Sequence, residues 1–378
     1  MQGHLEKRGK DSWTIIIDKG KNPVTNKRER IKKAVKGTKP QVQKVMNEML
    51  HQLQTGIYIE THNLTVAEYF KHWLATYCQP NLAPKTLHSY QSEINNHIIP
   101  NLGPIPLEKL SPLHLQSFYS QLLTSGRKDG KGGLSPRSVL YQHRIIREAL
   151  KHAFRWQLVT RNVADAVQPP RIKKKEMYVM SREDVLEFFK FNQSHRDYAI
   201  IYTAVYTGMR QGELLGLTWQ NINLAARTLT VKQQLQYVAS KGYIFKEPKT
   251  PKSKRKIPLT PGLIALFKEI KKEQAQYKLL AGNNYEDNDL VFCLENGKPL
   301  DPTNLTKRFK ALATKNGHPD MRFHDTRHTF ASIALASGVS MERLQALLGH
   351  ESITTTIDTY GHLSPATLRD AMDKFCDF

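Results

Sequence analysis

The chain has 378 residues and a formal net charge of +22 at pH 7, with 56 lysines and arginines against 34 aspartates and glutamates. This length allows about two or three domains, each with its own core. So large a positive charge favours a polyanionic partner, DNA or RNA, over a merely basic surface or a membrane-surface protein. No apolar run approaches the ~18 residues needed to span a bilayer, and the N-terminus lacks the apolar core of a signal peptide.

Cysteine usage points to a reducing compartment. The three cysteines, Cys78, Cys293 and Cys376, lie far apart and form no CxxC arrangement. We therefore expect free thiols in the cytosol.

Residues 1–60 are predicted to form a small basic domain. The run from Trp13 to Ile17 is rich in aromatic and β-branched residues, as strands are, and a basic stretch from Asn26 to Lys36 follows it. A helix is expected from Thr38, with a regular apolar face made by Val42, Val45, Met46, Met49, Leu50 and Leu53. A sheet packed on this helix, with cationic side chains on its open face, would suit DNA binding. The alternative is a disordered basic arm, against which the regular apolar face argues.

Residues 63–170 are predicted to be entirely helical. Thr65 is expected to cap a first helix, Pro84 to begin a second that ends near Ile99-Pro100, and Ser111-Pro112 to open a third. After a Gly/Lys loop at 126–135, a long helix starts at Ser135-Pro136. Its expected core positions are Val139, Ile146, Ala149, Leu150, Ala153 and Phe154. Basic side chains on the polar faces could contact phosphates, although each alone is more often a solvated charge: Lys85, Arg137, Arg144, Arg147 and Lys151.

The stretch from Gln168 to Glu176 predicts a domain boundary, because two prolines resist helix continuation and a lysine run is easily solvated. Its cationic side chains, Lys173, Lys174 and Lys175, could also follow a duplex backbone. In the last domain, 176–378, segments 229–235 and 243–259 are expected to be strands around a cationic hairpin. The predicted fold is α+β and multidomain: a small sheet-plus-helix domain, an all-helical domain, and a mainly helical domain with a small antiparallel sheet.

The segment from His324 to Tyr360 carries residue types suited to attack on a phosphodiester without a metal. His324 and Arg327 lie in HDTR, His350 ends LLGH, and Tyr360 follows. A tyrosine hydroxyl can act as a nucleophile, an arginine can neutralise phosphate oxygens, and histidines can move protons or hold the phosphate. Each residue alone is ordinary, so the prediction depends on their order and spacing.

Four segments, in this order, resemble the tyrosine recombinase (phage integrase) family: TGMRQGELLGL, PKTPKSKRKIPL, HDTRHTFAS and LLGHESITTTIDTYGHL. The basic domain ahead of a helical one resembles the arm-type DNA-binding domain of integrases from phages and integrative conjugative elements. The resemblance implies a core-binding (SAM-like) domain at 63–170 and a catalytic domain at 176–378.

The resemblance also implies a role for each matching residue. Arg210 and Arg327 match two invariant arginines that hold the non-bridging oxygens of the scissile phosphate. Tyr360 matches the nucleophile, one residue farther from His350 than in some members; a free phenol is only ~0.1% ionised at pH 7, so it needs a base or a cationic pocket. His324 matches the His/Lys position that can accept the tyrosine proton, and His350 matches the His/Trp position that hydrogen-bonds the phosphate.

The general acid is less sharply indicated. Protonation of the leaving 5′ oxygen calls for a mobile lysine, and the hairpin offers Lys249, Lys252, Lys254 and Lys256. Alignment to the family's hairpin favours Lys249, with Lys252 or Lys254 as alternatives. Glu213 matches a frequent acidic position that orients its neighbours; the alternative is a carboxylate on a helix surface.

The implied activity is site-specific recombination that integrates and excises a phage or mobile element through a 3′-phosphotyrosyl intermediate, with no cofactor. The implied partners are double-stranded attachment sites of core and arm type, an excisionase and a host DNA-bending protein, in the cytoplasm and nucleoid of a bacterial host. A homotetramer on DNA is implied, in which residues 364–378 pass to a neighbour; packing in cis is the alternative.

Two other functions remain as hypotheses, together with one alternative reading of the histidines as a metal site. A non-catalytic DNA-binding regulator is disfavoured by the complete set of six candidate catalytic residues, and a type IB topoisomerase-like nicking enzyme by the separate basic N-terminal domain. A metal site built from His324, His328, His350 and His362 is disfavoured because these histidines follow no known ligand spacing.

Overall fold

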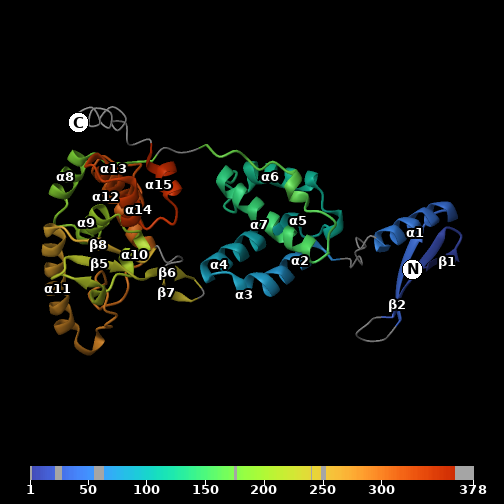
Figure 1. Cartoon of the computed structure of the whole chain (residues 1–378), viewed down its shortest axis with the longest axis horizontal. Helices are drawn as coiled ribbons and strands as arrows, with labels where there is room; N and C mark the ends of the chain where they lie inside the picture. Colours follow the sequence, from blue (N-terminus) through green and yellow to red (C-terminus); the bar gives the residue numbers. More distant parts are fainter. Residues whose placement is uncertain are drawn as a thin grey trace, which may run out of the picture. The chain divides into compact units, whose positions relative to one another are not determined.

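The computed structural model describes residues 2–21, 28–54, 64–173, 177–239, 241–247 and 253–361. The chain divides into two compact units, Met1–Lys173 and Lys174–Phe378. Figure 1 shows the elements of both units, coloured along the sequence from blue at the N-terminus to red near the C-terminus. In the described parts, none of the helices combines the length and apolar composition needed to cross a membrane.

The chain begins with a three-stranded antiparallel sheet covered on one face by a helix (Figure 1). Its elements are β1 (Gln2–Gly9), β2 (Ser12–Lys21), β3 (Arg28–Lys36) and α1 (Lys39–Gln54). Ile15, Ile17 and Ile31 are buried against Val42 and Met46 of the helix, since alternate strand residues face the same side. The predicted helix and its apolar face are confirmed, and the alternative of a disordered arm is wrong for the described residues. Strand β1 was not predicted, because its sequence is mostly polar.

The helical part of the first unit is built from helices of very different lengths around one core, which includes Tyr69, Phe70 and Trp73. Its main elements are α2 (Val66–Trp73), η1 (Leu74–Cys78), α3 (Gln79–Asn81), α4 (Pro84–Glu93), η2 (Ile94–Ile98), α5 (Ile99–Leu102), η3 (Leu107–Lys109), α6 (Pro112–Ser125), α7 (Pro136–Arg155) and η4 (Val163–Ala166). Thr65, Ser111 and Ser135 cap α2, α6 and α7, as predicted.

Two details of this helical part differ from the prediction. The second helix does not end near Pro100 but continues to Leu102 through the π-helical turn η2, in which the Ile99 N–H donates to the Ile94 carbonyl. This wider turn directly precedes the proline, which has no N–H of its own to donate. Phe154 is 52% exposed rather than in the core; it lies in the last turn of α7, at the edge of the face that buries Leu150 and Ala153.

The second unit is mainly helical, with two small antiparallel sheets (Figure 1). One sheet has the order β4-β5-β8 and the other pairs β6 with β7. The strands are β4 (Ile222–Asn223), β5 (Thr228–Val231), β6 (Gln234–Val238), β7 (Gly242–Lys246) and β8 (Arg255–Pro258). The helices are α8 (Arg182–Phe191), α9 (Tyr198–Thr207), α10 (Gln211–Leu215), η5 (Trp219–Asn221), α11 (Pro261–Ala281), η7 (Gly282–Asn284), α12 (Pro302–Lys315), α13 (Asp325–Ala336), α14 (Met341–Leu348) and α15 (Ile353–Tyr360).

Each of the two predicted strand segments contains two strands that belong to different sheets. The inner strands β6 and β7 pair with each other, whereas the outer strands β5 and β8 pair in the β4-β5-β8 sheet. Buried Leu229, Val231 and Leu235 keep one alternation across this break, so the sequence pattern gave no sign of it.

Close backbone packing positions the elements that carry the candidate site. Helix α9 ends at Thr207 and is followed by its capping residue Gly208, which has φ +62°; helix α13 packs against α9. Helix α10 lies against β6: a Cβ atom at Gly212 would approach the Leu235 carbonyl oxygen to 2.9 Å. Helices α14 and α15 pack on each other, and α14 also contacts α13 and β8. Segments far apart in the sequence therefore meet around the start of α10.

Candidate active site

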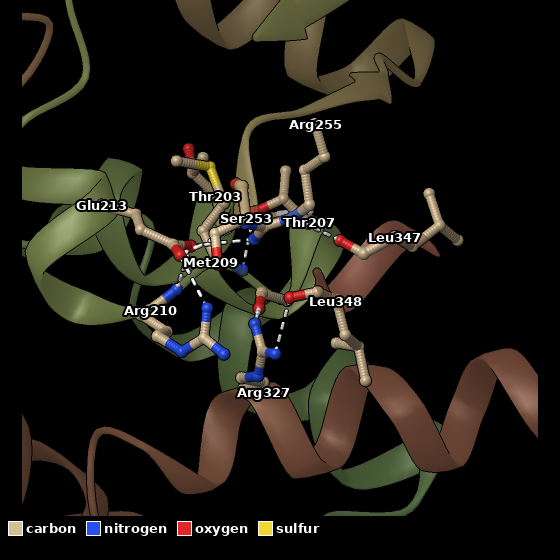
Figure 2. Close-up of polar contacts among 11 residues, drawn as sticks. Thr203, Thr207, Met209, Arg210, Glu213, Ser253, Arg255, Arg327, Leu347 and Leu348 are labelled. Atoms are coloured by element: carbon tan, nitrogen blue, oxygen red, sulfur yellow. Dashed lines mark hydrogen bonds and ion pairs between the residues drawn. The ribbon is translucent and has the colours of Figure 1, made fainter. Parts of the chain in front are cut away.

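A network of charged side chains surrounds the start of α10 (Figure 2). Arg210 precedes the helix and donates to Glu213 both from its backbone N–H, at 2.9 Å, and from Nη1, at 2.8 Å. From β8, Arg255 donates to both carboxylate oxygens of Glu213, at 3.2 and 2.8 Å. Burial opposes ionisation of Glu213, but the hydrogen bonds and charge of Arg255, together with Arg210, outweigh it and lower its pKa to about 2. The carboxylate is therefore charged and fixes both arginines.

Arg327 lies in α13 and is almost fully buried, with 2% of its surface exposed. Its Nη1 donates to the Gly208 carbonyl and its Nη2 to the Leu348 carbonyl, both at 2.7 Å. Burial, with a smaller contribution from Arg210, lowers the pKa of Arg327 to about 9, which still leaves the guanidinium protonated at neutral pH. It therefore places a fixed positive charge between the end of α9 and the end of α14.

Arg255 reaches the same end of α14. Its Nε donates to the Leu347 carbonyl at 2.6 Å, one residue before the carbonyl that Arg327 holds (Figure 2). These two hydrogen bonds fix the backbone that leads through Gly349, which has φ +66°, to His350.

Tyr360 is the last residue of α15, and only 1% of its surface is exposed. Its hydroxyl lies 2.8 Å from Nδ1 of His328, one helix position beyond Arg327. Burial raises the pKa of Tyr360 to about 12, although the charges of Arg327 and Arg210 act in the opposite direction. The Tyr360 hydroxyl is therefore protonated at neutral pH and hydrogen-bonded to His328.

The two histidines singled out by the sequence lie near Tyr360: His350 beside its ring, and His324 beside the ring of its partner His328. The ring of His350 is parallel to the Tyr360 ring at 6.4 Å between centroids, and its Nδ1 lies 2.9 Å from the Thr356 hydroxyl. His324 precedes α13 and packs edge-on against His328, at 5.1 Å between centroids.

These histidines are neutral at neutral pH. Burial lowers the pKa of His324 and of His350 to about 4. Interaction with His328 and the charge of Arg327 lower the His324 pKa further, and the charges of Arg327 and Arg210 do so for His350. Among the described residues, three guanidinium groups and one carboxylate form the charged network, so its net charge is positive. A phosphate diester, with one negative charge, fits such a site.

The structure brings together Arg210, Glu213, Arg327, His324, His350 and Tyr360. Lys249 and Lys252 lie outside the described residues. Lys254 is described, and its Nζ is 2.7 Å from the Glu247 carboxylate. His362, required for the alternative metal site, also lies outside, and no group of three metal-ligating side chains occurs in the described ranges.

Sequence reasoning missed two contributors to this network. Arg255 lies on the buried face of β8 together with Ile257, whereas Lys254 and Lys256 are exposed. The alternating pattern of a strand could therefore have indicated that Arg255 is buried. The sequence suggested His328 only as a ligand of the alternative metal site, and no sequence signal marked it as the partner of the Tyr360 hydroxyl.

A second cationic surface lies on the open face of the N-terminal sheet. Lys32 pairs with Ile16 and Arg30 with Asp18, opposite the face that α1 covers. Lys36 lies on the same face of β3, and all three basic side chains are exposed. The basic residues predicted for DNA contact, Lys85, Arg137, Arg144 and Lys173, are exposed as well, whereas Lys174 and Lys175 lie outside the described residues.

Comparison with known proteins places the chain in a family. The family model described as "Phage integrase family" matches residues 178–367, and the one described as "Phage integrase, N-terminal SAM-like domain" matches residues 65–123. A protein named "Tyrosine recombinase XerC-like" from Caldanaerobacter subterraneus subsp. tengcongensis is 26% identical over 98% of this chain and 97% of its own length. The ICEBs1 integrase of Bacillus subtilis is 22% identical over 99% of both chains.

Solved structures share the fold. The Tn1549 transposon integrase in complex with a circular intermediate DNA has a TM-score of 0.69 at 21% identity, covering 82% of this chain and 99% of that one. A lambda integrase dimer bound to a core site has a TM-score of 0.56 at 18% identity, covering 97% and 95%. Because the phage integrase model spans half of the sequence and includes every residue from Arg210 to Tyr360 discussed above, the chain belongs to the phage integrase family and is a tyrosine recombinase.

Proposed function

We propose that this recombinase integrates and excises a phage or other mobile element, with Tyr360 as the nucleophile that joins the DNA 3′ end. The observation that carries the proposal is the position of the Tyr360 hydroxyl. It is buried beside two neutral histidines, His328 and His350, and its pKa responds to the charges of two guanidinium groups, those of Arg210 and Arg327.

In this proposal Arg210 and Arg327 hold the non-bridging oxygens of the scissile phosphate. Arg327 uses one N–H of each Nη for backbone carbonyls, and a guanidinium has further donors. The Arg210 side chain is 37% exposed and held from one side by Glu213, so its remaining donors are accessible. Fixed cations at the place where charge develops stabilise the transition state without reorganisation. His350, parallel to the tyrosine ring, is assigned to hydrogen-bond the phosphate.

The reaction has two matching halves. The Tyr360 oxygen forms a bond to phosphorus, the bond from phosphorus to the 5′ oxygen breaks, and the 5′ hydroxyl of a partner strand later reverses the step. Lys249, with Lys252 or Lys254 as alternatives, donates the proton to the leaving oxygen. Because each bond broken is replaced by one of the same kind, the exchange needs neither ATP nor another cofactor.

We further propose two classes of DNA site and a tetramer. Lambda integrase structures include a dimer bound to a core site and a tetramer bound to a Holliday junction, the latter with a TM-score of 0.55 to this chain. By analogy, the helical and catalytic parts hold core-type attachment sites in a bacterial host, and the open face of the N-terminal sheet binds arm-type sites. Residues 364–378, outside the described range, are assigned to pack on a neighbouring protomer. An excisionase and a host DNA-bending protein complete the assembly.

A suicide substrate tests this function against the other two hypotheses. The probe is a nicked duplex that spans the attachment-site core, defined by the direct repeats that flank the element. The proposal predicts a covalent adduct and recombinant products. An adduct with relaxation of supercoiled DNA but no strand joining would support the topoisomerase, and no adduct would support the non-catalytic regulator.

A further inference from the structure

The hydroxyl of Tyr360 has one hydrogen-bond partner among the described residues, and it is not the histidine that the sequence favoured. Nδ1 of His328 lies 2.8 Å from the hydroxyl, with ring centroids 5.6 Å apart. His324 contacts the ring of His328 rather than the tyrosine oxygen. Nδ1 of His350 already lies 2.9 Å from the Thr356 hydroxyl. His328 is thus the imidazole in position to receive the proton of the nucleophile.

The protonation states fit a transfer in this direction. Burial lowers the pKa of His328 below its ordinary value of 6.5, so the imidazole is neutral and one ring nitrogen has a free lone pair. The phenol is protonated, since burial raises its pKa to about 12. With the ring proton on Nε2, the Tyr360 O–H donates to Nδ1.

We propose that His328 is a catalytic residue, the general base that removes the proton from Tyr360 as it attacks the phosphate; this rests on the proposed function of Tyr360 as the nucleophile. The proton moves from the hydroxyl to Nδ1 of His328 while the new oxygen–phosphorus bond forms. The bond from phosphorus to the 5′ oxygen breaks, and that oxygen receives its proton from the hairpin lysine. In the reverse step His328 returns its proton to the tyrosine oxygen.

The incoming phosphate helps this base. Other charged or titratable groups that act on His328 are Asp325, Arg327, Arg322 and His324, from α13 and the turn before it. His350, before α15, also interacts with it, and Tyr360 faces it from α15. Two of these are arginines, which disfavour an imidazolium. A bound phosphate brings negative charge to Arg327 and so makes the protonated state of His328 easier to form.

Two substitutions separate proton transfer from positioning. His328→Asn places an amide oxygen near the position of Nδ1, so it can accept the hydrogen bond but cannot take the proton at neutral pH. His328→Phe removes both abilities. The matched control is His318→Asn, because Nδ1 of His318 lies 2.7 Å from the Tyr178 hydroxyl in the same unit, outside the active-site network. The probe is the core-site suicide duplex, used with the full chain, and thermal unfolding and DNA binding establish that each variant is folded.

We expect both His328 variants to lose cleavage by a factor on the order of 10²–10⁴, and His318→Asn to cleave like wild type. Above neutral pH the wild-type rate should level off, whereas the His328→Asn rate should rise about tenfold per pH unit as the phenol ionises without a base. A substrate with sulfur at the leaving 5′ position, which needs no acid, should restore cleavage to a variant of the hairpin lysine but not to His328→Asn.

Wild-type cleavage by His328→Asn, whether or not His328→Phe is slow, would overturn the base assignment. A failure of the proposed function looks different. In that case wild type forms no adduct, or Tyr360→Phe forms as much adduct as wild type.

Discussion

Arg255 and Arg327, from β8 and α13, donate to the carbonyl oxygens of consecutive residues, Leu347 and Leu348. Arg255 also holds Glu213, which in turn holds Arg210. A single hydrogen-bond network therefore connects the strand after the hairpin, the start of α10 and the end of α14. Arginine suits this position because its planar group satisfies a carboxylate and a carbonyl at once.

Replacement of Arg255 by lysine should break part of this hydrogen-bond network. Lysine cannot bridge both oxygens of Glu213 and the Leu347 carbonyl, so the buried carboxylate loses part of its compensation. We expect a lower melting temperature and a loss of cleavage of at least about tenfold, because Arg210 and His350 are no longer held in place. The control is Arg308→Lys, which breaks a similar two-bond pair with Asp197, at 2.7 and 2.8 Å, elsewhere in the unit. Equal cleavage by the two folded variants would contradict a special role for Arg255.

Glu213 predicts a specific dependence of stability on pH. Its pKa is about 2 in the folded chain and 4.5 ordinarily, so its stabilising contribution is present above pH 4.5 and is lost as the pH falls toward 2. The size of this contribution is on the order of 3 kcal/mol. Glu213→Gln should therefore be clearly less stable than wild type at pH 7, and the difference should shrink below pH 4.5. Calorimetric unfolding of both proteins over this pH range measures it; a difference that stays constant would refute the assignment.

His324 and His350 should also make the folded chain less stable in acid, at higher pH than Glu213 does. With pKa values of about 4 against an ordinary 6.5, His324 and His350 are buried uncharged, so unfolding takes up protons between these limits. Wild-type stability should begin to fall below pH 6.5, before Glu213 is affected. In the same titration, Glu213→Gln should keep this first loss.

Gly208 should not tolerate a side chain. It has φ +62°, and a Cβ atom there would lie 2.4 Å from Cδ1 of Phe330. Gly338→Ala is the matched control, since Gly338 has φ +82° with nothing within 4 Å of a Cβ atom. Both substitutions should cost about 1–2 kcal/mol for the backbone conformation, and Gly208→Ala about 1–3 kcal/mol more for overpacking. Gly208→Ala should also reduce cleavage, because the Gly208 carbonyl accepts a hydrogen bond from Arg327. Similar melting temperatures for the two variants would be inconsistent with this packing.

The open face of the N-terminal sheet should bind arm-type DNA. We expect Lys32→Glu with Lys36→Glu to weaken binding to an arm-site duplex and to lower its salt dependence by about one unit per lysine. Deletion of residues 1–60 should likewise abolish integration at sites with arms but spare cleavage of core-site DNA. The control pair, Lys39→Glu with Lys44→Glu, lies on α1 rather than on the sheet. Full integration by the deleted protein would contradict the assignment.

Several residues of the candidate site could be predicted from the sequence. Arg210, Arg327, His350 and Tyr360 stand in motifs with a fixed order, so the pattern alone selected them as candidates, and the structure brings them together. Thr65, Ser111 and Ser135 likewise marked helix starts, because capping is a local property.

What the sequence could not show depends on contacts between distant segments. The family pattern predicts that Glu213 orients its neighbours, but not that it is buried and held by an arginine from β8. The hydrogen bond from His328 to Tyr360 exists only because α15 folds back onto α13. The break between β5 and β6 is invisible for the same reason: strand pairing, not alternation, decides it.

The most direct test of the central claim is to identify the residue that carries the DNA. The covalent adduct from the core-site suicide substrate is digested and its DNA-linked peptide is sequenced by mass spectrometry, with Tyr360→Phe run in parallel. Tyr360 at the end of α15 should be the modified residue, joined to a DNA 3′ phosphate, and Tyr360→Phe should give no adduct. An adduct on any other residue, or one undiminished in Tyr360→Phe, would contradict the account.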